Sequence, residues 1–182
     1  MKVKLILFVF TIFPFLCIGQ NLQWKVNSNE SSITYKGNHI LHSWEGSNNK
    51  IYGVGVPDAK QENLDKLAIL IYVRDFDTNN SGRDAHAMEI LDAIKFPEIK
   101  FYSDKIKIID NKAYIHGSFD FHGIKINKEV EADLKSGKTR LELNGIFYIK
   151  PTDFKIKLPS FLSIKIDDLL EINYTIVLNK LS

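Results

Sequence analysis

The stretch "AYIHGSFDFHGIKINKEVEADL", residues 113–134, decides the fold because it contains two strand-like halves joined by a short turn. The first half alternates, and its apolar side chains and one glycine share a face: Ile115, Gly117, Phe119 and Phe121. Its more polar side chains share the other face: Tyr114, His116, Ser118 and Asp120. His122-Gly123 is a two-residue turn signal, and so short a connection makes the two halves antiparallel neighbours. The sequence therefore predicts a β-hairpin with one buried face.

The same pattern extends in both directions along the chain. Eight segments rich in β-branched and aromatic residues are predicted strands: Ser32–Lys36, Ile51–Val56, Leu67–Asp75, Ile99–Ile109, Ala113–Phe121, Ile124–Leu134, Thr139–Ile149 and Leu170–Leu178. Leu22–Val26 is a candidate ninth. Short turn signals such as Asp110-Asn111-Lys112 separate them. This order predicts an all-β chain of antiparallel neighbours, with no internal repeat and no linker.

Glycines interrupt the apolar faces of two predicted strands. Gly117 lies on the apolar face of Ala113–Phe121, and Gly145 lies on that of Thr139–Ile149. Glycine inside a strand suits a strongly bent sheet, where the strands curl and side-chain volume must be reduced. About eight such strands in sequence order predict a closed up-and-down barrel, whose interior can hold one small ligand. The alternative that the residues leave open is a two-sheet sandwich with a filled core.

One helix is predicted between the strands, beginning at Ser81 and ending near Lys95. Ser81 is the predicted N-cap, with Asp84 three residues on, and Pro97 stops the helix. Its apolar stripe consists of Ala87, Ile90, Leu91 and Ile94. A single short amphipathic helix in this place is expected to cover an open end or a flank of the sheet.

Residues 1–19 are predicted to be a cleaved secretory signal peptide. Lys2 and Lys4 give a positive start, an apolar run follows, and small residues precede the predicted cleavage after Gly19. The apolar run is shorter than the ~18 residues expected of a transmembrane helix, and a proline interrupts it. No other segment could span a bilayer. We therefore expect an exported chain, periplasmic or secreted, in which residues 20–182 form a single domain.

The composition argues against several partners and chemistries. The full chain has 24 basic and 22 acidic residues, and loss of Lys2 and Lys4 with the leader makes the mature chain neutral. No polybasic run is present, which argues against nucleic acid or an anionic membrane as an electrostatic partner. Cys17 is the single cysteine, so the mature chain has no disulfide and no thiol chemistry. Roughly 160 residues are enough to bury one core.

The segment "DFDTNNSGRDAHAMEILDAIKFPEIKFYSDKI", residues 75–106, carries a specific pattern. Its elements are Asp77-Thr78, Arg83-Asp84-x-His86, Phe96-Pro97, Ile99 and Phe101-x-Ser103. Together with "HGSFDFHGIKI" at residues 116–126 and the early strand containing His39, it resembles the YceI-like family of exported, polyisoprenoid-binding bacterial proteins. The resemblance covers nearly all of residues 22–180. It implies an eight-stranded, lipocalin-like antiparallel barrel with a long apolar cavity for isoprenoid lipids, including the tails of quinones and polyprenyl phosphates.

The chain departs from this family pattern in two places. Relatives usually carry Arg-x-Asp-aromatic-Gly where this chain reads "KPTDFKIKLPSF", residues 150–161. Asp153-Phe154 is kept, but Pro151 stands near the arginine position and Lys155 replaces the glycine. The early "NHILHSWEG", residues 38–46, also differs in its spacing. Both segments are candidates to border the mouth of the cavity.

A metal or catalytic site finds little support in the residues. His116 and His122 share a strand face but lie roughly 20 Å apart in a straight strand, so they cannot hold one ion together. His39 and His42 are expected on opposite faces, unless a turn there brings them to the cluster at residues 83–86. No nucleophile elbow, Gly-rich phosphate loop or HExxH motif is present. We predict no metal, no cofactor and no catalytic residue.

Arg83, Asp84 and His86 are predicted to be rim or lid residues. Arg83 and Asp84 are expected to pair with each other or with neighbouring backbone, and so to fix the loop onto the barrel rim. His86 is a candidate to touch a polar head group at the mouth. The alternative for the three side chains is a general acid–base set.

The predicted cavity residues are large side chains on inward faces: Phe101, Ile115, Phe119, Phe121, Leu143, Phe147, Tyr174 and Ile176. An isoprenoid tail has no hydrogen-bonding groups, so its site needs only shape, apolar walls and exclusion of water. The expected function is a non-catalytic, exported protein that sequesters or carries an isoprenoid lipid of the quinone or polyprenyl phosphate type. Two alternatives stay open. One is an interaction module with a filled barrel that binds an envelope protein, and the other is a lipid hydrolase or isomerase with a polar cluster inside the cavity.

Overall fold

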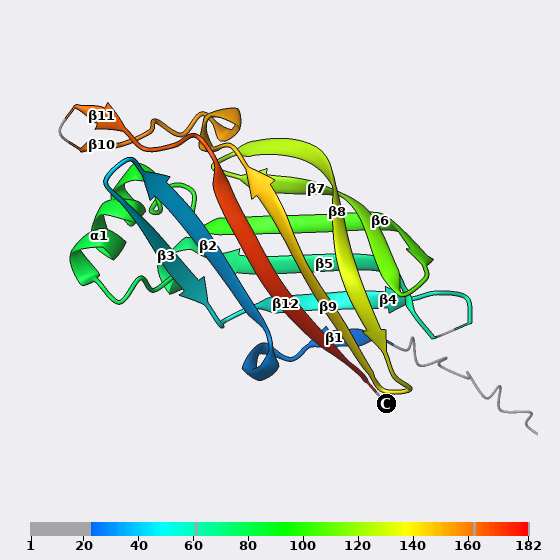
Figure 1. Ribbon diagram of the computed structural model, residues 1–182. Coiled ribbons are helices and arrows are strands. Elements are labelled where there is room, and N and C mark those ends of the chain that lie inside the picture. Colours follow the sequence, from blue (N-terminus) through cyan, green and yellow to red (C-terminus); the bar gives the residue numbers. More distant parts are fainter. Residues whose placement is uncertain (1–22, 61, 162, 182) are drawn as a thin grey trace, which may run out of the picture.

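The computed structural model describes residues 23–60, 62–161 and 163–181, and the predicted signal peptide lies outside them. The described chain is mostly antiparallel strand, with one α-helix at one end (Figure 1). The strands are β1 Trp24–Val26, β2 Ser32–His39, β3 His42–Asn48, β4 Tyr52–Pro57, β5 Leu64–Tyr72, β6 Glu98–Ile109, β7 Lys112–Phe121, β8 Ile124–Ser136, β9 Arg140–Ile149, β10 Ser160–Phe161, β11 Ile164–Lys165 and β12 Leu170–Lys180. The helices are α1 Ser81–Ile90 and three 3-10 turns, η1 Ser28–Glu30, η2 Val73–Asp75 and η3 Pro151–Phe154.

Eight of the described strands form a closed ring. Their order is β1-β4-β5-β6-β7-β8-β9-β12, and pairing of β1 with β12 closes the ring. Neighbours are antiparallel all the way round. The prediction of an eight-stranded antiparallel barrel is confirmed, and the sandwich alternative is wrong.

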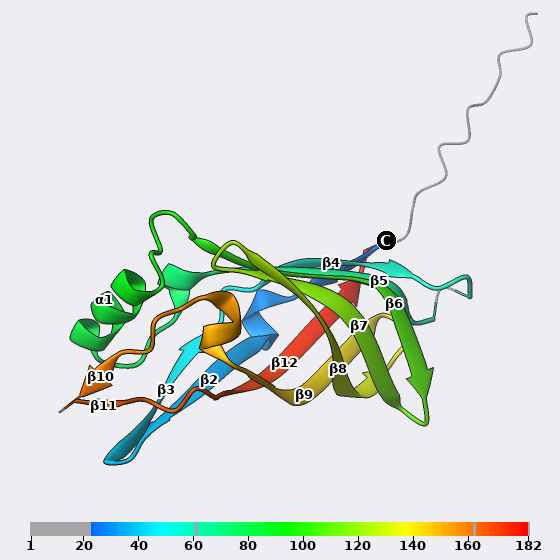
Figure 2. The ribbon, with the colours of Figure 1, turned by 90° about the horizontal axis from the view of Figure 1, so that it is seen from above.

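The β2–β3 hairpin extends the barrel wall at one end. β12 pairs with β2 over residues 171–175 and with β1 over residues 178–180, while η1 breaks the chain between β1 and β2. A bridge between Ser47 and Asp77 joins the free edge of β3 to the segment after η2. Seen from above, the hairpin, α1 and the β10–β11 hairpin gather at the same end of the barrel (Figure 2). This end is the open one.

Some strand predictions were wrong in extent. β3, β10 and β11 were not predicted, because β3 is largely polar and the other two are only two residues long. The predicted strand Leu67–Asp75 begins earlier, at Leu64, and ends at Tyr72. There η2 turns the chain, and the Val73 amide donates to the Pro97 carbonyl at 3.0 Å.

The predicted helix exists, but both of its ends were wrong. The N-cap is Asn80 rather than Ser81, and its side-chain oxygen accepts from the Arg83 amide at 2.9 Å. Asparagine and serine are about equally good N-caps, so the sequence alone could not separate them. The helix ends at Ile90 and a turn follows, which leaves the predicted stripe residue Ile94 97% exposed. The helix covers the open end of the barrel, which is one of the two positions predicted for it (Figure 1).

The half of the barrel that β1 closes is a solid core. Trp24, Leu141 and Leu178 are fully buried there. They belong to one cluster with Leu64 and Leu67, on the facing side of the ring. Burial of side chains of this size is the main stabilising contribution in a domain without disulfides.

Gly117 and Gly145 make room for aromatic rings inside the barrel. A Cβ atom at Gly117 would lie 2.4 Å from the ring of Phe101, and one at Gly145 would lie 2.5 Å from the hydroxyl of Tyr174. Neither position can hold a larger residue without displacing the ring. The glycines on the apolar faces thus reduce side-chain volume, as the sequence pattern predicted.

Candidate ligand-binding site

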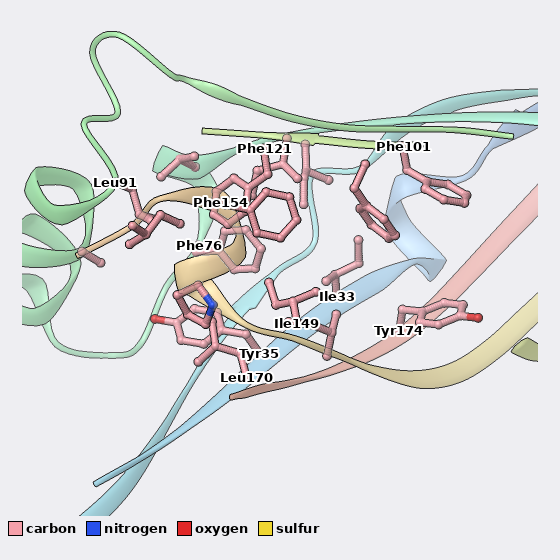
Figure 3. Close-up of a pocket in the computed structure, with 18 of the residues that line it drawn as sticks. Ile33, Tyr35, Phe76, Leu91, Phe101, Phe121, Ile149, Phe154, Leu170 and Tyr174 are labelled. Carbon is pink, nitrogen blue, oxygen red and sulfur yellow. The ribbon is translucent and has the colours of Figure 1, made fainter. Parts of the chain in front are cut away.

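A cavity occupies the other half of the barrel, next to α1 (Figure 3). Its volume is about 300 Å³, which is within the range of small-molecule sites. Ile115 and Leu143 line it and also belong to the solid core, so they form its floor. Ala87 and Ile90 of α1 line its mouth. The barrel is therefore filled at one end and hollow at the other.

The predicted cavity residues all lie on the cavity wall: Phe101, Ile115, Phe119, Phe121, Leu143, Phe147, Tyr174 and Ile176. Four of the rings form a row across the barrel. The centroid distances are 4.6 Å for Phe101–Phe119, 5.3 Å for Phe119–Phe147 and 5.9 Å for Phe147–Tyr174. These are favourable separations for tilted aromatic pairs. That these side chains contact a ligand stays a prediction.

The wall also contains residues that sequence reasoning missed. Ile69 of β5 lines the cavity, but the run Leu67–Ile71 is apolar on both faces, so alternation could not show which face is inward. Ile156 and Leu158 follow η3 in an irregular segment and line the cavity as well. A segment without periodicity gives no signal of burial.

Two tyrosine hydroxyl groups are the notable polar atoms of the wall. Burial raises the pKa of Tyr174, and the charges of Asp133 and Glu131 raise it further. Its hydroxyl donates to the Glu131 carbonyl at 2.7 Å. Burial also raises the pKa of Tyr35, as does the charge of Asp84. Both phenols therefore stay neutral, and the lining suits an uncharged, apolar guest.

The three predicted rim residues all border the cavity, but they do different things. Asp84 Oδ1 accepts from the Thr78 amide at 3.1 Å and from the Thr78 hydroxyl at 2.6 Å, which ties the helix to the preceding loop. His86 Nδ1 lies 3.7 Å from Glu89. Of the two predicted arrangements, Asp84 has the contact with neighbouring backbone, whereas Arg83 and Asp84 do not pair with each other: within the described chain the Arg83 guanidinium makes no ion pair or hydrogen bond. The rim thus holds one structural carboxylate and one available cation.

Replacing Asp84 by alanine is expected to lower the free energy of unfolding by about 1–3 kcal/mol. The reason is that Thr78, which is buried, would lose the acceptor of its amide and the closer of the two acceptors of its hydroxyl, leaving only the Asn80 carbonyl at 3.3 Å. Urea denaturation measures the change. Glu89→Ala is the control, because this carboxylate lies on the same helix with its side chain 83% exposed. Equal effects of the two substitutions would show that the Thr78 contact is unimportant.

The segment that departs from the family pattern closes one side of the cavity. Phe154 of η3 lies 5.2 Å from Phe121, ring to ring, and its carbonyl lies 3.0 Å from His122 Nδ1. Lys155 follows in the left-handed conformation, with φ 57°. The family pattern that the sequence resembles has glycine here, and only glycine adopts this conformation without steric cost. Lysine is therefore strained in a turn that the fold retains.

Lys155→Gly is expected to raise the free energy of unfolding by about 0.5–1 kcal/mol, because the left-handed strain is relieved. The midpoint of thermal unfolding measures it. Lys157→Gly is a matched control two residues away, where φ is not positive, and it is expected to destabilise slightly. A lower midpoint for Lys155→Gly would mean that its side chain makes a compensating contact.

The histidines do not converge on a metal site in the described chain. His39 and His42 pair directly across the β2–β3 turn with ring centroids 5.6 Å apart, so the expectation of opposite faces was wrong. His39 Nε2 lies 3.2 Å from the Ile164 carbonyl. Among the described residues no three His, Cys, Asp or Glu side chains are placed to hold one ion. Nor does that part of the chain contain a helix long and apolar enough to cross a bilayer.

A sequence model of the YceI-like domain matches residues 24–178, which is most of the chain. The chain belongs to the YceI-like family. A UPF0312 protein of Pseudomonas syringae pv. tomato is 27% identical over 140 residues, covering 70% of this chain and 69% of the relative. A UPF0312 protein of Photorhabdus laumondii is 24% identical over 149 residues, covering 77% of this chain and 78% of the relative.

Several solved structures share the fold. Burkholderia cenocepacia BcnA superposes with a TM-score of 0.74 at 18% identity, covering 84% of this chain and 98% of that one. A polyisoprenoid binding domain from Saccharophagus degradans gives 0.68 at 9% identity, covering 86% and 97%. The Campylobacter jejuni YceI protein gives 0.62 at 23% identity, covering 75% and 85%. At these identities the likeness concerns the architecture.

Proposed function

We propose that this YceI-like protein is exported and binds an isoprenoid lipid, of the quinone or polyprenyl phosphate type, without transforming it. The observation that carries the proposal is the cavity of about 300 Å³ in one half of a barrel whose other half is solid. A solid core already stabilises the fold, so the hollow half is available for a ligand. The similarity to a structure described as a polyisoprenoid binding domain supports the ligand class.

The chemistry of the wall supports a hydrocarbon tail. Most of the lining residues are Ile, Leu, Phe and Val, and the Tyr174 hydroxyl is already hydrogen-bonded to backbone. Burial of a tail gains roughly 2.5 kcal/mol for each 100 Å² of apolar surface removed from water. No hydrogen bond has to be matched, so many isoprenoids of the right width fit such a wall.

The rim supports a polar head at the mouth. Arg83 borders the cavity with an available guanidinium. Its charge partly offsets the rise in the pKa of Tyr35 that burial and Asp84 cause, so the two side chains are neighbours. A guanidinium and a phenol are both hydrogen-bond donors, and quinone carbonyl and phosphate oxygens are acceptors. Residues 1–19 have the pattern of a signal peptide, which supports export.

The two alternative functions have weaker support. An interaction module was expected to have a filled barrel, and here the filling stops at Ile115 and Leu143. A lipid hydrolase or isomerase would need an acid–base pair facing the substrate, whereas Asp84 is engaged by Thr78 and the His86 side chain is 61% exposed. Binding is therefore the function that the geometry supports best.

Native mass spectrometry of protein purified from the periplasm tests the proposal, with organic extraction of any lipid that accompanies it. A stoichiometric adduct that fragments as a prenyl chain is the expected result. A protein that carries no lipid, and that also binds neither added ubiquinone nor added polyprenyl phosphate, would overturn the proposal. In that case the interaction module becomes the better explanation.

A further inference from the structure

The barrel wall has a gap in its backbone pairing. β8 spans Ile124–Ser136 and β9 spans Arg140–Ile149, but in the described chain they pair only over residues 133–136 and 141–144. β8 meanwhile stays paired with β7 from Ile124 to Asp133. The ribbons of β8 and β9 diverge from their shared turn (Figures 1 and 2). Both ends of the gap are filled. A Cβ atom at Gly145 would lie 2.4 Å from the Glu131 carbonyl oxygen, and at the other end Ile124, Ile126 and Ile149 pack in one cluster with Phe154. We name the part between these contacts, residues 127–131 of β8 and 146–148 of β9, the β8–β9 window.

Two side chains span the β8–β9 window where backbone hydrogen bonds would otherwise lie. Lys128 Nζ of β8 donates to the Tyr148 carbonyl of β9 at 2.5 Å. Tyr174 of β12 lies across Gly145 and donates to the Glu131 carbonyl of β8 at 2.7 Å. Side chains near solvent change rotamer far faster than paired strands separate. The window can therefore open without breaking the barrel.

The window adjoins the deep end of the cavity. Val130, Phe147 and Tyr174 stand beside it and line the cavity. Val130 pairs directly with the floor residue Ile115. Lys128 lies on the same face of β8 as Val130, so its apolar stem faces inward while its ammonium reaches the outside. The opening that the window offers is thus lined by aromatic, aliphatic and methylene groups.

We propose that the β8–β9 window is a second opening of the cavity, through which an isoprenoid tail longer than the cavity leaves the barrel. This inference rests on the proposed function and deepens it, because it extends the ligands to those whose tail is longer than the cavity. With the window, the hollow half is a passage that begins at α1 and ends at the side of the barrel. Without it, the cavity has a single opening, at α1.

The cavity length shows why the distinction matters. Leu170 lines the mouth and Ile176 the deep end, and six residues of strand span roughly 20 Å. An isoprene unit contributes four main-chain carbon–carbon bonds of about 1.5 Å, or about 5 Å in a zigzag. About four units therefore fill the cavity. The solid core blocks a straight continuation, so a longer tail must fold back or leave sideways.

A disulfide across the window is the direct test. Glu131 and Ile146 are exposed, lie on opposite sides of the window, and would be the second pair beyond the end of the ladder. Expressed from Gln20 onward, the chain has no other cysteine. Oxidised Glu131→Cys/Ile146→Cys is expected to bind undecaprenol, with eleven isoprene units, at least tenfold more weakly than wild type. Its affinity for geranylgeraniol, with four units, is expected to be unchanged, and reduction is expected to restore undecaprenol binding.

Two further variants complete the test. Lys135→Cys/Glu142→Cys is the control, because these residues already pair within the ladder. Lys128→Met keeps the length of the side chain and removes one bridge, so undecaprenol should associate several-fold faster while geranylgeraniol does not. Lys125→Met, an exposed lysine of the same strand, is its control.

The outcomes separate the two proposals. If neither the oxidised disulfide nor Lys128→Met alters undecaprenol binding, the window is not an opening and the inference is wrong. If the disulfide does not form, the rate at which undecaprenol associates with Lys128→Met decides whether the window is an opening. If wild type binds neither undecaprenol nor geranylgeraniol, it is the proposed function that fails.

Discussion

Replacing Trp24 by alanine is expected to lower the free energy of unfolding by about 3–5 kcal/mol. Trp24 is fully buried and pairs with Gly55 on one side and Lys180 on the other, so it stands where the barrel closes. β1 is only three residues long, and the indole is its largest contribution to the solid core. Removal leaves a void whose walls lose their packing partners. Urea denaturation measures the effect, monitored by the circular dichroism of the backbone, because this signal does not depend on the removed tryptophan.

Two substitutions show whether packing is the cause. Lys25→Ala changes the exposed neighbour on the same strand and is expected to stay within about 0.5 kcal/mol of wild type. Trp24→Phe is expected to cost less than Trp24→Ala, partly because the buried Trp24 Nε1 has no hydrogen-bond partner among the described residues. If Trp24→Ala were as mild as Lys25→Ala, closure of the barrel would not depend on this ring.

The inward faces of the long strands could be predicted because their side chains alternate. β7, β9 and β12 carry most of the predicted cavity residues, and each strand repeats with period two over about ten residues. Phe119 and Phe147 therefore come to lie 5.3 Å apart in the structure, although 28 positions separate their numbers in the sequence. Alternation along a strand determines which side chains face inward, and closure of the ring brings the inward faces of different strands together.

The window and the irregular wall could not be predicted in the same way. Loss of pairing between β8 and β9 depends on how far two strands diverge in space, and no local pattern encodes this. One signal was nevertheless present: the inward face of β8 runs Ile124, Ile126, Lys128, Val130, and a lysine interrupts the apolar series. A charged side chain in such a series indicates an opening, because its ammonium must reach water.

The hollow half owes its cavity to the wall rather than to small side chains. Its inward residues include Phe101, Phe119 and Phe147, which are as large as those of the solid core. In the wall of the hollow half, the β2–β3 hairpin replaces the short strands β1 and β4, and β8 diverges from β9. The solid half and the hollow half of the barrel thus differ in how the strands of their walls are paired.

Ala87→Trp is expected to weaken isoprenoid binding by roughly 50-fold or more, with little effect on stability. Ala87 of α1 lines the mouth of the cavity and is only partly buried, so an indole there would occupy space that the tail needs. If the indole displaces about 100 Å² of buried tail, the loss is about 2.5 kcal/mol. Fluorescence titration with geranylgeraniol measures the affinity, and thermal unfolding checks the fold.

Ala85→Trp is the matched control for this substitution. Ala85 lies two positions earlier on the same helix, is exposed, and is not part of the cavity wall. The same bulk is thus added to the same helix, facing solvent, and binding should stay within about twofold of wild type. Equal loss in both variants would mean that the helix, and not its cavity-facing side, controls binding. If both variants kept the affinity of wild type, the tail would not enter beside α1, and the mouth of the cavity would lie elsewhere on the barrel.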